Sequence, residues 1–378
     1  MEPFPGKFRS LFPIAEKYVY LNHASIGVLS RPTRDCMAMV LDSGMTEGPR
    51  DFERLEELQS VARRSAARLV NAQPHQIAFL RNTSEAISAI ANGICWQRGD
   101  NLVSAAVEFP ANVYPWMLAA KRHGVEMRVA QSGTGGLVSK EDLFARVDER
   151  TRVVTVSWVQ FATGQRLDIR QIGKFCRDRG IFFVVDVVQG LGALQLDVER
   201  DFVDAFAGGA QKFLLGPKGV SLLYLSDDAL NRVHPTVVGW TAVKDYSDYL
   251  VHDINFREGA VRFEGGTPNV AGICGLGESI ELFLQAGPEK IEEHVLSLNR
   301  YLTRGLREHG YRIASSPHPA EASAIVTCRH DRFPAQEICN RLDVSNVITS
   351  ARNDALRVAP HFYNTSADID ALLAALPA

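Results

Sequence analysis

The feature that most constrains the fold is a regular alternation of short β-branched runs with helical patterns through the middle of the chain. The strand-like runs lie at 101–107, 152–159 and 181–188, and helical patterns lie between them at 113–124, 139–148 and 168–180. Strand, helix and strand in this order form right-handed crossovers. The sequence therefore predicts an α/β fold, with a mostly parallel sheet between two layers of helices. In such sheets, ligands bind at the carboxyl ends of the strands.

The pattern changes after about residue 270. Two long helical patterns come first, and several short strand-like runs and a terminal helical pattern follow. This order is typical of an α+β unit rather than of further parallel crossovers. We expect a large domain over residues 16–265, and a smaller α+β domain formed by residues 1–15 and 266–378.

Composition narrows the class of protein. Hydrophobic residues make up 46% of the 378 residues, charged residues 22%, and the net charge is −3. This balance suits an enzyme of small molecules and does not favour a nucleic-acid or membrane surface. The cysteines are scattered without metal-ligand spacing, so we expect no metal site and reduced thiols in a cytoplasmic protein. They are Cys36, Cys95, Cys176, Cys274, Cys328 and Cys339.

Two charged residues lie in apolar surroundings. Asp186 follows five apolar residues in "IFFVVD", and Lys212 lies in the nearly uncharged run "AGGAQKFLLG". A buried carboxylate needs a cationic partner, and a desolvated lysine becomes a nucleophile for carbonyls. Lysine and acid on either side of an aldehyde-bearing pyridine would suit pyridoxal phosphate. The two residues alone leave open the alternative that Asp186 caps a helix and Lys212 lies at the surface.

A phosphate site and an aromatic platform are suggested by two further segments. In "FLRNTSEAI", a strand end passes into a helix at Thr83 and Ser84, where hydroxyls and free N–H groups favour an anion. An ordinary helix cap is the alternative interpretation. Phe109 follows the strand at 101–107 and could lie over a planar ring, although an aromatic residue there is also typical of a core.

Seven motifs, in order along nearly the whole chain, resemble the class V aminotransferase family of fold-type I pyridoxal-phosphate enzymes. This family includes cysteine desulfurases, selenocysteine lyases, kynureninases and isopenicillin N epimerases. The motifs are "YLNHASIG" (20–27), "RNTSEAI" (81–87), "EFPANVYPW" (108–116), "DVVQGLG" (186–192), "GGAQKFLLGPKG" (208–219), "RFEGGTPN" (262–269) and "LRVAPHFYNT" (356–365).

The resemblance implies roles around the cofactor ring. Lys212 matches the lysine that forms the Schiff base, and Asp186 matches the partner of the pyridinium nitrogen. Gln189 matches the residue near the ring hydroxyl. Phe109 matches the stacking position, which is usually histidine in the desulfurases. Gln211 replaces a common histidine and could still donate to the phosphate.

The resemblance also implies phosphate and substrate contacts. Thr83 and Ser84 match the phosphate-binding pair. Thr267 matches a residue that reaches the phosphate from a neighbouring subunit, which implies a homodimer with a shared site. Arg357 matches the arginine that grips the substrate α-carboxylate, a task that suits the guanidinium fork. His23 could contact substrate or form a hydrogen bond with the backbone, and both alternatives stay open.

The chain departs from the desulfurase pattern at several positions. Gly209 stands where desulfurases have a phosphate-binding serine, and Trp158 where they often have asparagine. The segment 343–358 carries no cysteine before Arg357, and Cys339 belongs to an apparent helix. We therefore expect no persulfide at the usual desulfurase position.

The reaction is left open among a few possibilities. We expect an amino-acid substrate joined to the cofactor as a Schiff base, with the freed Lys212 as the base for the α-proton. Transamination and β-elimination with C–S cleavage are the main alternatives, and epimerisation is another. A non-catalytic subunit of the same fold, or a lysine aldolase without cofactor, would not explain why Lys212, Asp186 and Arg357 are all present.

Overall fold

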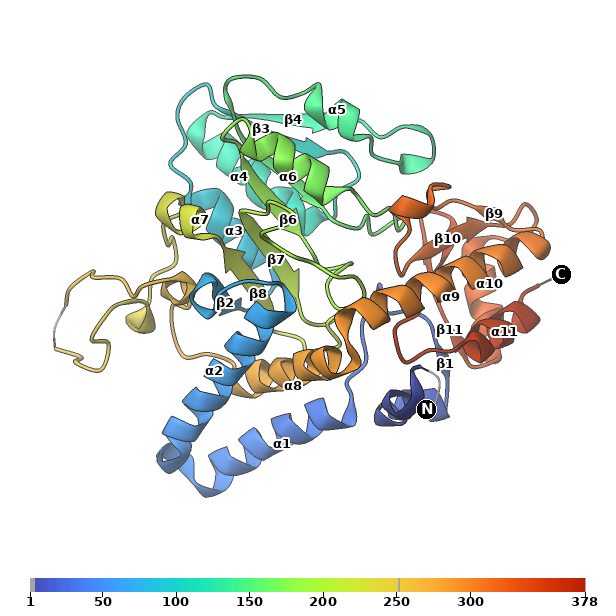
Figure 1. The fold of residues 1–378 in the computed structure, drawn as a ribbon, viewed down its shortest axis with the longest axis horizontal. Coiled ribbons are helices and arrows are strands. Elements are labelled where there is room, and N and C mark those ends of the chain that lie inside the picture. The colour runs from blue at the N-terminus through green and yellow to red at the C-terminus, as the bar shows by residue number, and fades with distance from the viewer. Residues whose placement is uncertain (1–3, 251, 378) are drawn as a thin grey trace.

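A seven-stranded sheet forms the centre of the computed structural model, which describes residues 4–250 and 252–377 (Figure 1). Its strand order is β2-β8-β7-β6-β5-β3-β4. Only β8 runs antiparallel to its neighbours β2 and β7, so the predicted mostly parallel α/β sheet is confirmed. The strands are β2 (Ile77–Leu80), β3 (Asn101–Ala105), β4 (Glu126–Ala130), β5 (Thr151–Ser157), β6 (Phe182–Asp186), β7 (Ala205–Gly209) and β8 (Ser221–Leu225).

Both faces of this sheet are buried. In β6, Phe183 and Val185 belong to one hydrophobic cluster, and Phe182 and Val184 belong to another on the opposite face. A strand covered on both faces reads as a continuous apolar run, which is why "IFFVV" carries no polar alternation. The helices that connect the strands are α3 (Thr83–Gly93), α4 (Tyr114–His123), α5 (Lys140–Phe144) and α6 (Ile169–Arg177), and α7 (Asp227–Arg232) follows the last strand, β8.

Three long helices pack together below the sheet in Figure 1. They are α1 (Arg31–Thr46), α2 (Phe52–Leu69) and α8 (Val270–Ala286). Small residues allow their close approach. A Cβ atom on Gly275 would lie 2.6 Å from Cγ of Met37, and one on Gly277 would lie 2.7 Å from Cβ of Ala62.

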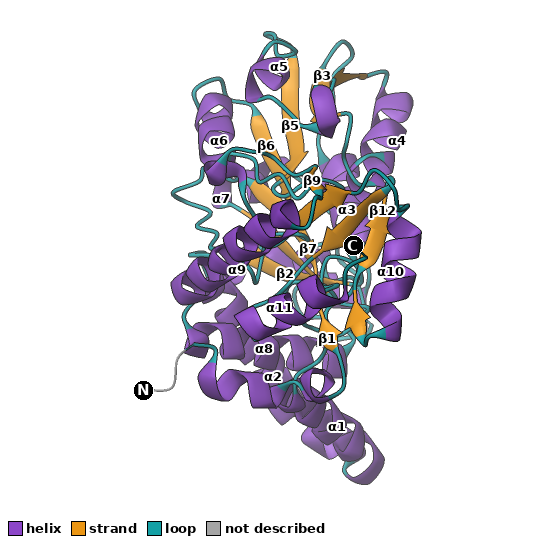
Figure 2. Cartoon of the chain, turned by 90° about the vertical axis from the view of Figure 1, so that its right-hand side faces the viewer, coloured by secondary structure: helices purple, strands orange, loops and turns teal. Residues whose placement is uncertain are grey.

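A second, antiparallel sheet lies toward the C-terminus, with strand order β12-β13-β10-β9. A separate hydrophobic cluster lies between it and the helices α9, α10 and α11 (Figure 2). The short β1 pairs in parallel with β11, which joins the N-terminal segment to this part of the molecule. The elements are β1 (Val19–Tyr20), α9 (Pro288–Glu308), β9 (Arg312–Ile313), β10 (Val326–Arg329), α10 (Ala335–Val344), β11 (Val347–Ile348), β12 (Ser350–Arg352), β13 (Ala355–Val358) and α11 (Ser366–Ala375).

Short 3₁₀ helices complete the secondary structure. They lie at Gly6–Leu11, Pro13–Glu16, Gly48–Asp51, Pro74–Gln76, Pro110–Asn112, Thr134–Gly136, Trp240–Ala242, Ala260–Phe263 and Pro319–Glu321. No helix within 4–250 or 252–377 is both long enough and apolar enough to span a membrane. The division into domains at 16–265 and at 1–15 with 266–378 stays a prediction.

Candidate active site

One cavity at the carboxyl ends of β5, β6 and β7 brings together seven of the residues that the sequence singled out. Ser157 and Asp186 end two of these strands, and the turn after β7 carries Lys212. The cavity is therefore where parallel sheets bind ligands. The seven residues are Thr83, Ser84, Phe109, Asp186, Gln189, Gln211 and Lys212.

The amine of Lys212 has no partner in the described part of the chain. Its Nζ atom forms no hydrogen bond or ion pair there and lies 5.0 Å from the ring centroid of Phe109. Burial lowers the pKa of Lys212 to about 8, the charge of Asp186 partly opposes this change, and Arg357 and Arg352 add to it. An amine of this kind is neutral more often than a surface lysine, so it can attack a carbonyl near neutral pH.

The carboxyl group of Asp186 is buried and only partly satisfied. Oδ1 accepts a hydrogen bond from the Val188 N–H at 2.9 Å, and the other oxygen has no hydrogen-bond partner among the residues described. The pKa of Asp186 is raised to about 7, and burial is the main cause. The neighbouring Glu108 contributes to this rise, whereas Lys212 opposes it. The negative charge of the Asp186 carboxylate is unfavourable in this buried position, so a cation in the cavity would be bound by it.

The middle of the cavity offers an acceptor and an aromatic face. Gln189 donates from Nε2 to the Ala24 carbonyl at 3.1 Å, and its buried Oε1 has no partner. Phe109 is 42% exposed and contacts Phe161 edge-on, at 5.3 Å between ring centroids. Oε1 of Gln189 can accept a hydrogen bond from a ligand, and the exposed ring face of Phe109 can stack on a planar group.

The far end of the cavity is built for an anion. The N–H groups of Thr83 and Ser84 open α3 and have no partner in the described chain, because the Asn82 side chain caps the N–H of Glu85 instead. A Cβ atom on Gly209 would lie 2.7 Å from Oε1 of Gln211 and 3.0 Å from Oγ1 of Thr83. Glycine at this position therefore keeps the corner open beside the helix N-terminus, where a phosphate is favoured.

Taken together, these groups fit pyridoxal phosphate. The carboxyl of Asp186 suits the protonated ring nitrogen, the oxygen of Gln189 suits the ring hydroxyl, and the start of α3 suits the phosphate. The face of Phe109 suits the ring, and the amine of Lys212 suits the aldehyde.

Arg357 lies beside this cavity rather than in its wall. It is 2% exposed, and its Nη1 donates at 2.9 Å to the carbonyl of Phe161, which does line the cavity. Nη2 donates to Oγ of Ser25 at 2.7 Å. Burial, with a smaller contribution from Arg352, lowers the pKa of Arg357 to about 10. A buried guanidinium without a carboxylate is suited to an anionic ligand.

His23 and Thr267 do not line the cavity. His23 is fully buried, its Nδ1 bonds the Ala359 carbonyl at 2.8 Å, and its Nε2 bonds the Tyr363 hydroxyl at 2.9 Å. Both ring nitrogens have partners within the described chain, so the backbone contact is present, and a contact of His23 with substrate stays a prediction. Thr267 is exposed just before α8, and its contact with a second subunit stays a prediction.

Glu108 is a residue of this site that the sequence reasoning missed. It is buried and accepts hydrogen bonds from the backbone N–H and the hydroxyl of Ser157, from Nδ2 of Asn112 and from Nε2 of Gln160. Burial raises the pKa of Glu108, and these donors oppose the change. The signal was present in the sequence, because Glu108 follows an apolar strand just as Asp186 does.

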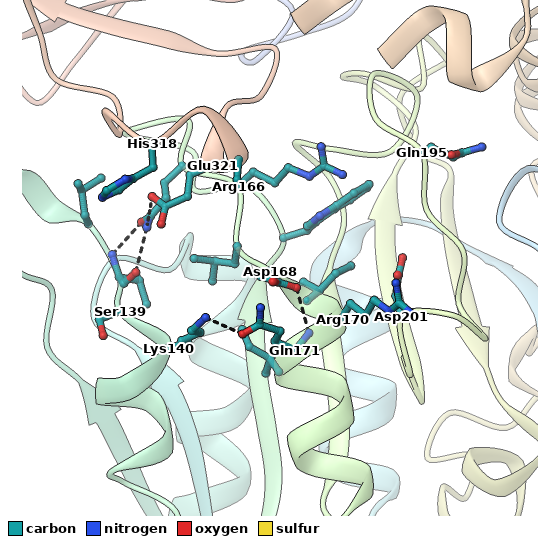
Figure 3. A pocket seen from close by; sticks show the side chains of 18 of the residues that line it. Ser139, Lys140, Arg166, Asp168, Arg170, Gln171, Gln195, Asp201, His318 and Glu321 are labelled. Carbon is teal, nitrogen blue, oxygen red and sulfur yellow. Dashed lines mark hydrogen bonds between the residues drawn. The ribbon is translucent and has the colours of Figure 1, made fainter. Parts of the chain in front are cut away.

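A second, larger cavity of about 1360 Å³ lies between α6, α9 and the loop at 318–321 (Figure 3). Two ion pairs lie within its lining, Arg166 with Glu292 and Arg200 with Asp201. Arg166 forms an ion pair with Glu292 at 2.6 Å, and Gln165 donates to Glu321 at 3.0 Å. It contains none of the predicted site residues, and Trp158, one of the departures noted above, lines it. We therefore place the chemistry in the cavity around Lys212.

The class of protein that this fold and site define is a pyridoxal-phosphate enzyme of the α/β type. The chain belongs to the class V aminotransferase family, whose sequence model matches residues 50–372. Its enzymes depend on pyridoxal phosphate, so the predicted family, cofactor and enzyme class are confirmed. A probable cysteine desulfurase of Methanothermobacter thermautotrophicus is 30% identical over 336 residues, which cover 82% of this chain and 81% of that protein.

Two solved structures share the fold over nearly the whole chain. The apo cysteine desulfurase of Thermococcus onnurineus has a TM-score of 0.89 at 21% identity, covering 99% of this chain and 97% of that one. The complex of the cystine C–S lyase C-DES with cysteine persulfide has a TM-score of 0.89 at 24% identity, covering 96% and 98%. At these identities they confirm the fold-type I architecture. Relatives named cysteine desulfurase do not support our expectation that no persulfide forms at the usual desulfurase position.

Proposed function

We propose that this protein is a pyridoxal-phosphate enzyme that cleaves the C–S bond of a sulfur-containing amino acid. The observation that carries the proposal is the desolvated amine of Lys212, without a hydrogen bond or ion pair in the described chain, in the same cavity as the half-satisfied carboxyl of Asp186. The names of its relatives, cysteine desulfurase and cystine C–S lyase, support a sulfur-containing substrate.

The residues would hold the cofactor at four points. Asp186 would pair with the ring nitrogen, Gln189 would accept from the ring hydroxyl, and Phe109 would stack on the ring face. Thr83 and Ser84 would hold the phosphate, assisted by the side chain of Gln211. When bound, pyridoxal phosphate supplies an aldehyde for the lysine and an electron-withdrawing ring that stabilises negative charge at the substrate Cα.

The chain's own groups then position substrate and move protons. The guanidinium of Arg357 binds the α-carboxylate and fixes the orientation of the Cα–H bond. The Nζ of Lys212, neutral above a pKa of about 8, removes the α-proton as general base. Loss of the sulfur group from Cβ completes the elimination, and the product hydrolyses to pyruvate and ammonia.

We further propose that the sulfur leaves without being carried on a cysteine of the chain. None of the six cysteines lines the cavity, and four of them are buried. Burial raises the pKa of Cys328 to about 12, and burial also raises the pKa of Cys339. Thiols of this kind are poor nucleophiles because the thiolate is the reactive form.

Product analysis tests this proposal. The holoenzyme is incubated with L-cysteine and with L-cystine, and pyruvate, alanine, sulfide and protein-bound sulfur are measured. We expect pyruvate with sulfide from L-cysteine, and pyruvate with cysteine persulfide from L-cystine. Alanine with sulfur on the protein would show desulfurase chemistry instead, and a 2-oxo acid that retains sulfur would show transamination. Racemised substrate would show epimerisation.

A second experiment tests the role of Lys212 separately from the reaction type. Borohydride reduction of the protein with bound pyridoxal phosphate should fix the cofactor to Lys212, as peptide mapping detects. Lys218, exposed six residues further on, is the internal control and should stay unmodified. Cofactor fixed elsewhere would refute the assignment.

We also propose the homodimer, in which Thr267 of one copy reaches the phosphate site of the other. Thr267 is exposed and lies outside the cavity of its own chain, as this arrangement requires. Sedimentation of the holoenzyme measures the state directly. A fully active monomer would refute the shared site.

A further inference from the structure

Two arginines share one hydroxyl oxygen beside the active-site cavity. Arg357, on β13, donates from Nη2 to Oγ of Ser25 at 2.7 Å, and Arg352, on β12, donates from its own Nη2 to the same oxygen at 3.3 Å. Both guanidinium groups are therefore held close together. Arg357 is buried, whereas Arg352, on the neighbouring strand, is exposed.

No carboxylate neutralises this pair within the described chain. Neither Arg352 nor Arg357 takes part in an ion pair there, and their other contacts are with neutral oxygens. Other arginines of the chain commonly have an acidic partner; Arg166 and Arg63, for example, are paired with Glu292 and Glu264. Two like charges this close repel one another unless an anion lies between or beside them.

The pair lies within electrostatic reach of the reacting centre. The charges of Arg357 and Arg352 both act on the amine of Lys212, and Arg357 donates to the carbonyl of the cavity residue Phe161. Arg357 is near and buried, and Arg352 lies further out toward solvent. An extended ligand that enters the cavity would therefore meet the two cations at different points along its length.

We propose that Arg352 is a specificity-determining residue that binds a second anionic group, at the far end of the substrate side chain. The inference rests on the proposed function, in which Arg357 binds the α-carboxylate. It adds the substrate class: an α-amino acid whose side chain ends in an acid group, such as the distal carboxylate of a disulfide-linked amino acid. One carboxylate would lie at Arg357 and the second anion at Arg352, each held by charge-assisted hydrogen bonds.

Binding of unreactive acids tests this inference without any catalysis. The holoenzyme is titrated calorimetrically, at low ionic strength, with succinate, which has two carboxylates, and with butyrate, which has one. A charge-assisted contact at a half-open site is worth about tenfold in affinity. We expect the wild type to bind succinate about tenfold more tightly than butyrate, and Arg352→Gln to bind both alike.

A matched variant controls for the loss of one positive charge. Arg329→Gln removes an exposed arginine from the adjacent part of the same sheet, where its Nη2 donates to the Asn353 carbonyl at 3.2 Å and not to Ser25. It should keep the tenfold preference for succinate. Equal affinities in the wild type would overturn the inference, and so would a preference that persists in Arg352→Gln.

Kinetics separate this inference from the proposed function. With L-cystine, Arg352→Gln should raise KM about tenfold and change kcat little, whereas constants for S-methyl-L-cysteine, which lacks the second acid, should not change. Equal effects on both substrates would overturn the role of Arg352. Failure of the wild type to release sulfur products from either substrate would overturn the proposed function, and the succinate-to-butyrate ratio would still decide the role of Arg352.

Discussion

Replacing Lys212 by methionine should stabilise the apo protein, because it removes a buried amine whose charge opposes folding. Methionine has a similar length and no charge, and the amine forms no hydrogen bond or ion pair that would be lost within the chain described. Lys212 has a pKa of about 8 in the folded protein, against an ordinary value of 10.5.

The size of the effect follows from these two pKa values. One pH unit corresponds to about 1.4 kcal/mol, so the charged amine lowers the free energy of unfolding by about 3 kcal/mol below pH 8. The folded pKa of about 8 already includes the attraction of Asp186 for this amine. Because Lys212 is only half-buried, solvent screening reduces the effect, and we expect a gain of about 2 kcal/mol at pH 7. The folded pKa is the lower one, so the penalty is full below pH 8, declines as the pH rises from 8 to 10.5, and vanishes above that.

Urea unfolding of both apo proteins at pH 7 and at pH 10 measures this dependence. The gain should be about 2 kcal/mol at pH 7 and below about 1 kcal/mol at pH 10. Lys218→Met, at an exposed lysine in the same segment, is the matched control and should change stability by less than about 0.5 kcal/mol. A loss of stability in Lys212→Met, or the same gain at both pH values, would refute the idea that desolvation lowers the pKa of this amine.

Three further predictions concern the cavity and its support. Asp186→Asn removes the negative charge from the cavity, so kcat of the holoenzyme should fall about a hundredfold with little change in KM; an unchanged kcat would contradict the pairing with the cofactor ring. Arg357→Gln should lower kcat/KM about a hundredfold, mainly through KM, because charge-assisted bonds to the α-carboxylate are lost; an unchanged KM would exclude that contact. Gly192→Ala should lower the free energy of unfolding by at least about 3 kcal/mol in urea, because φ is +102° and the added Cβ would lie 2.1 Å from the Phe213 carbonyl oxygen. Gly44→Ala, in α1 with no atom within 4 Å of the new Cβ, should instead gain roughly 0.5–1 kcal/mol, and equal effects of the two substitutions would refute the steric argument.

The central sheet could be predicted from the sequence because its strands are covered on both faces. Nearly continuous apolar runs such as 181–188, separated by helical patterns, are typical of buried parallel strands. The strand boundaries could not be predicted as well. That run was expected to continue to Val188, but β6 ends at Asp186 because the Val188 N–H turns back to the Asp186 carboxylate. The strand end is thus set by a side-chain contact, which hydrophobic patterns do not record.

Some site residues could be recognised from their local sequence, whereas the roles of others depend on contacts with distant parts of the chain. Asp186 and Lys212 could be singled out because each is a charge in an apolar run, a local signal. His23 could not be assigned, because its second ring nitrogen is occupied by Tyr363, 340 residues away. Glu108 was overlooked because its donors come from two other segments of the chain, around Asn112 and around 157–160.

Glu108 adds a second acid beside Asp186. The carboxyls of Asp186 and Glu108 lie close enough for Glu108 to raise the pKa of Asp186, and the strand register places Ser157, which donates to Glu108, directly beside Asp186. The guanidinium groups of Arg357 and Arg352, held at Ser25, act on Lys212 in the opposite sense to Asp186 and lower the pKa of its amine. A cofactor with a cationic ring nitrogen is favoured with that nitrogen toward the acids, and an anionic substrate is favoured toward the arginines. Reversing either ligand would place like charges together in a region of low dielectric constant, where repulsion is strong. Burial is the main cause that lowers the pKa of the Lys212 amine, and the two arginines add to it. The arginines that favour an anionic substrate therefore also help the amine to accept the α-proton.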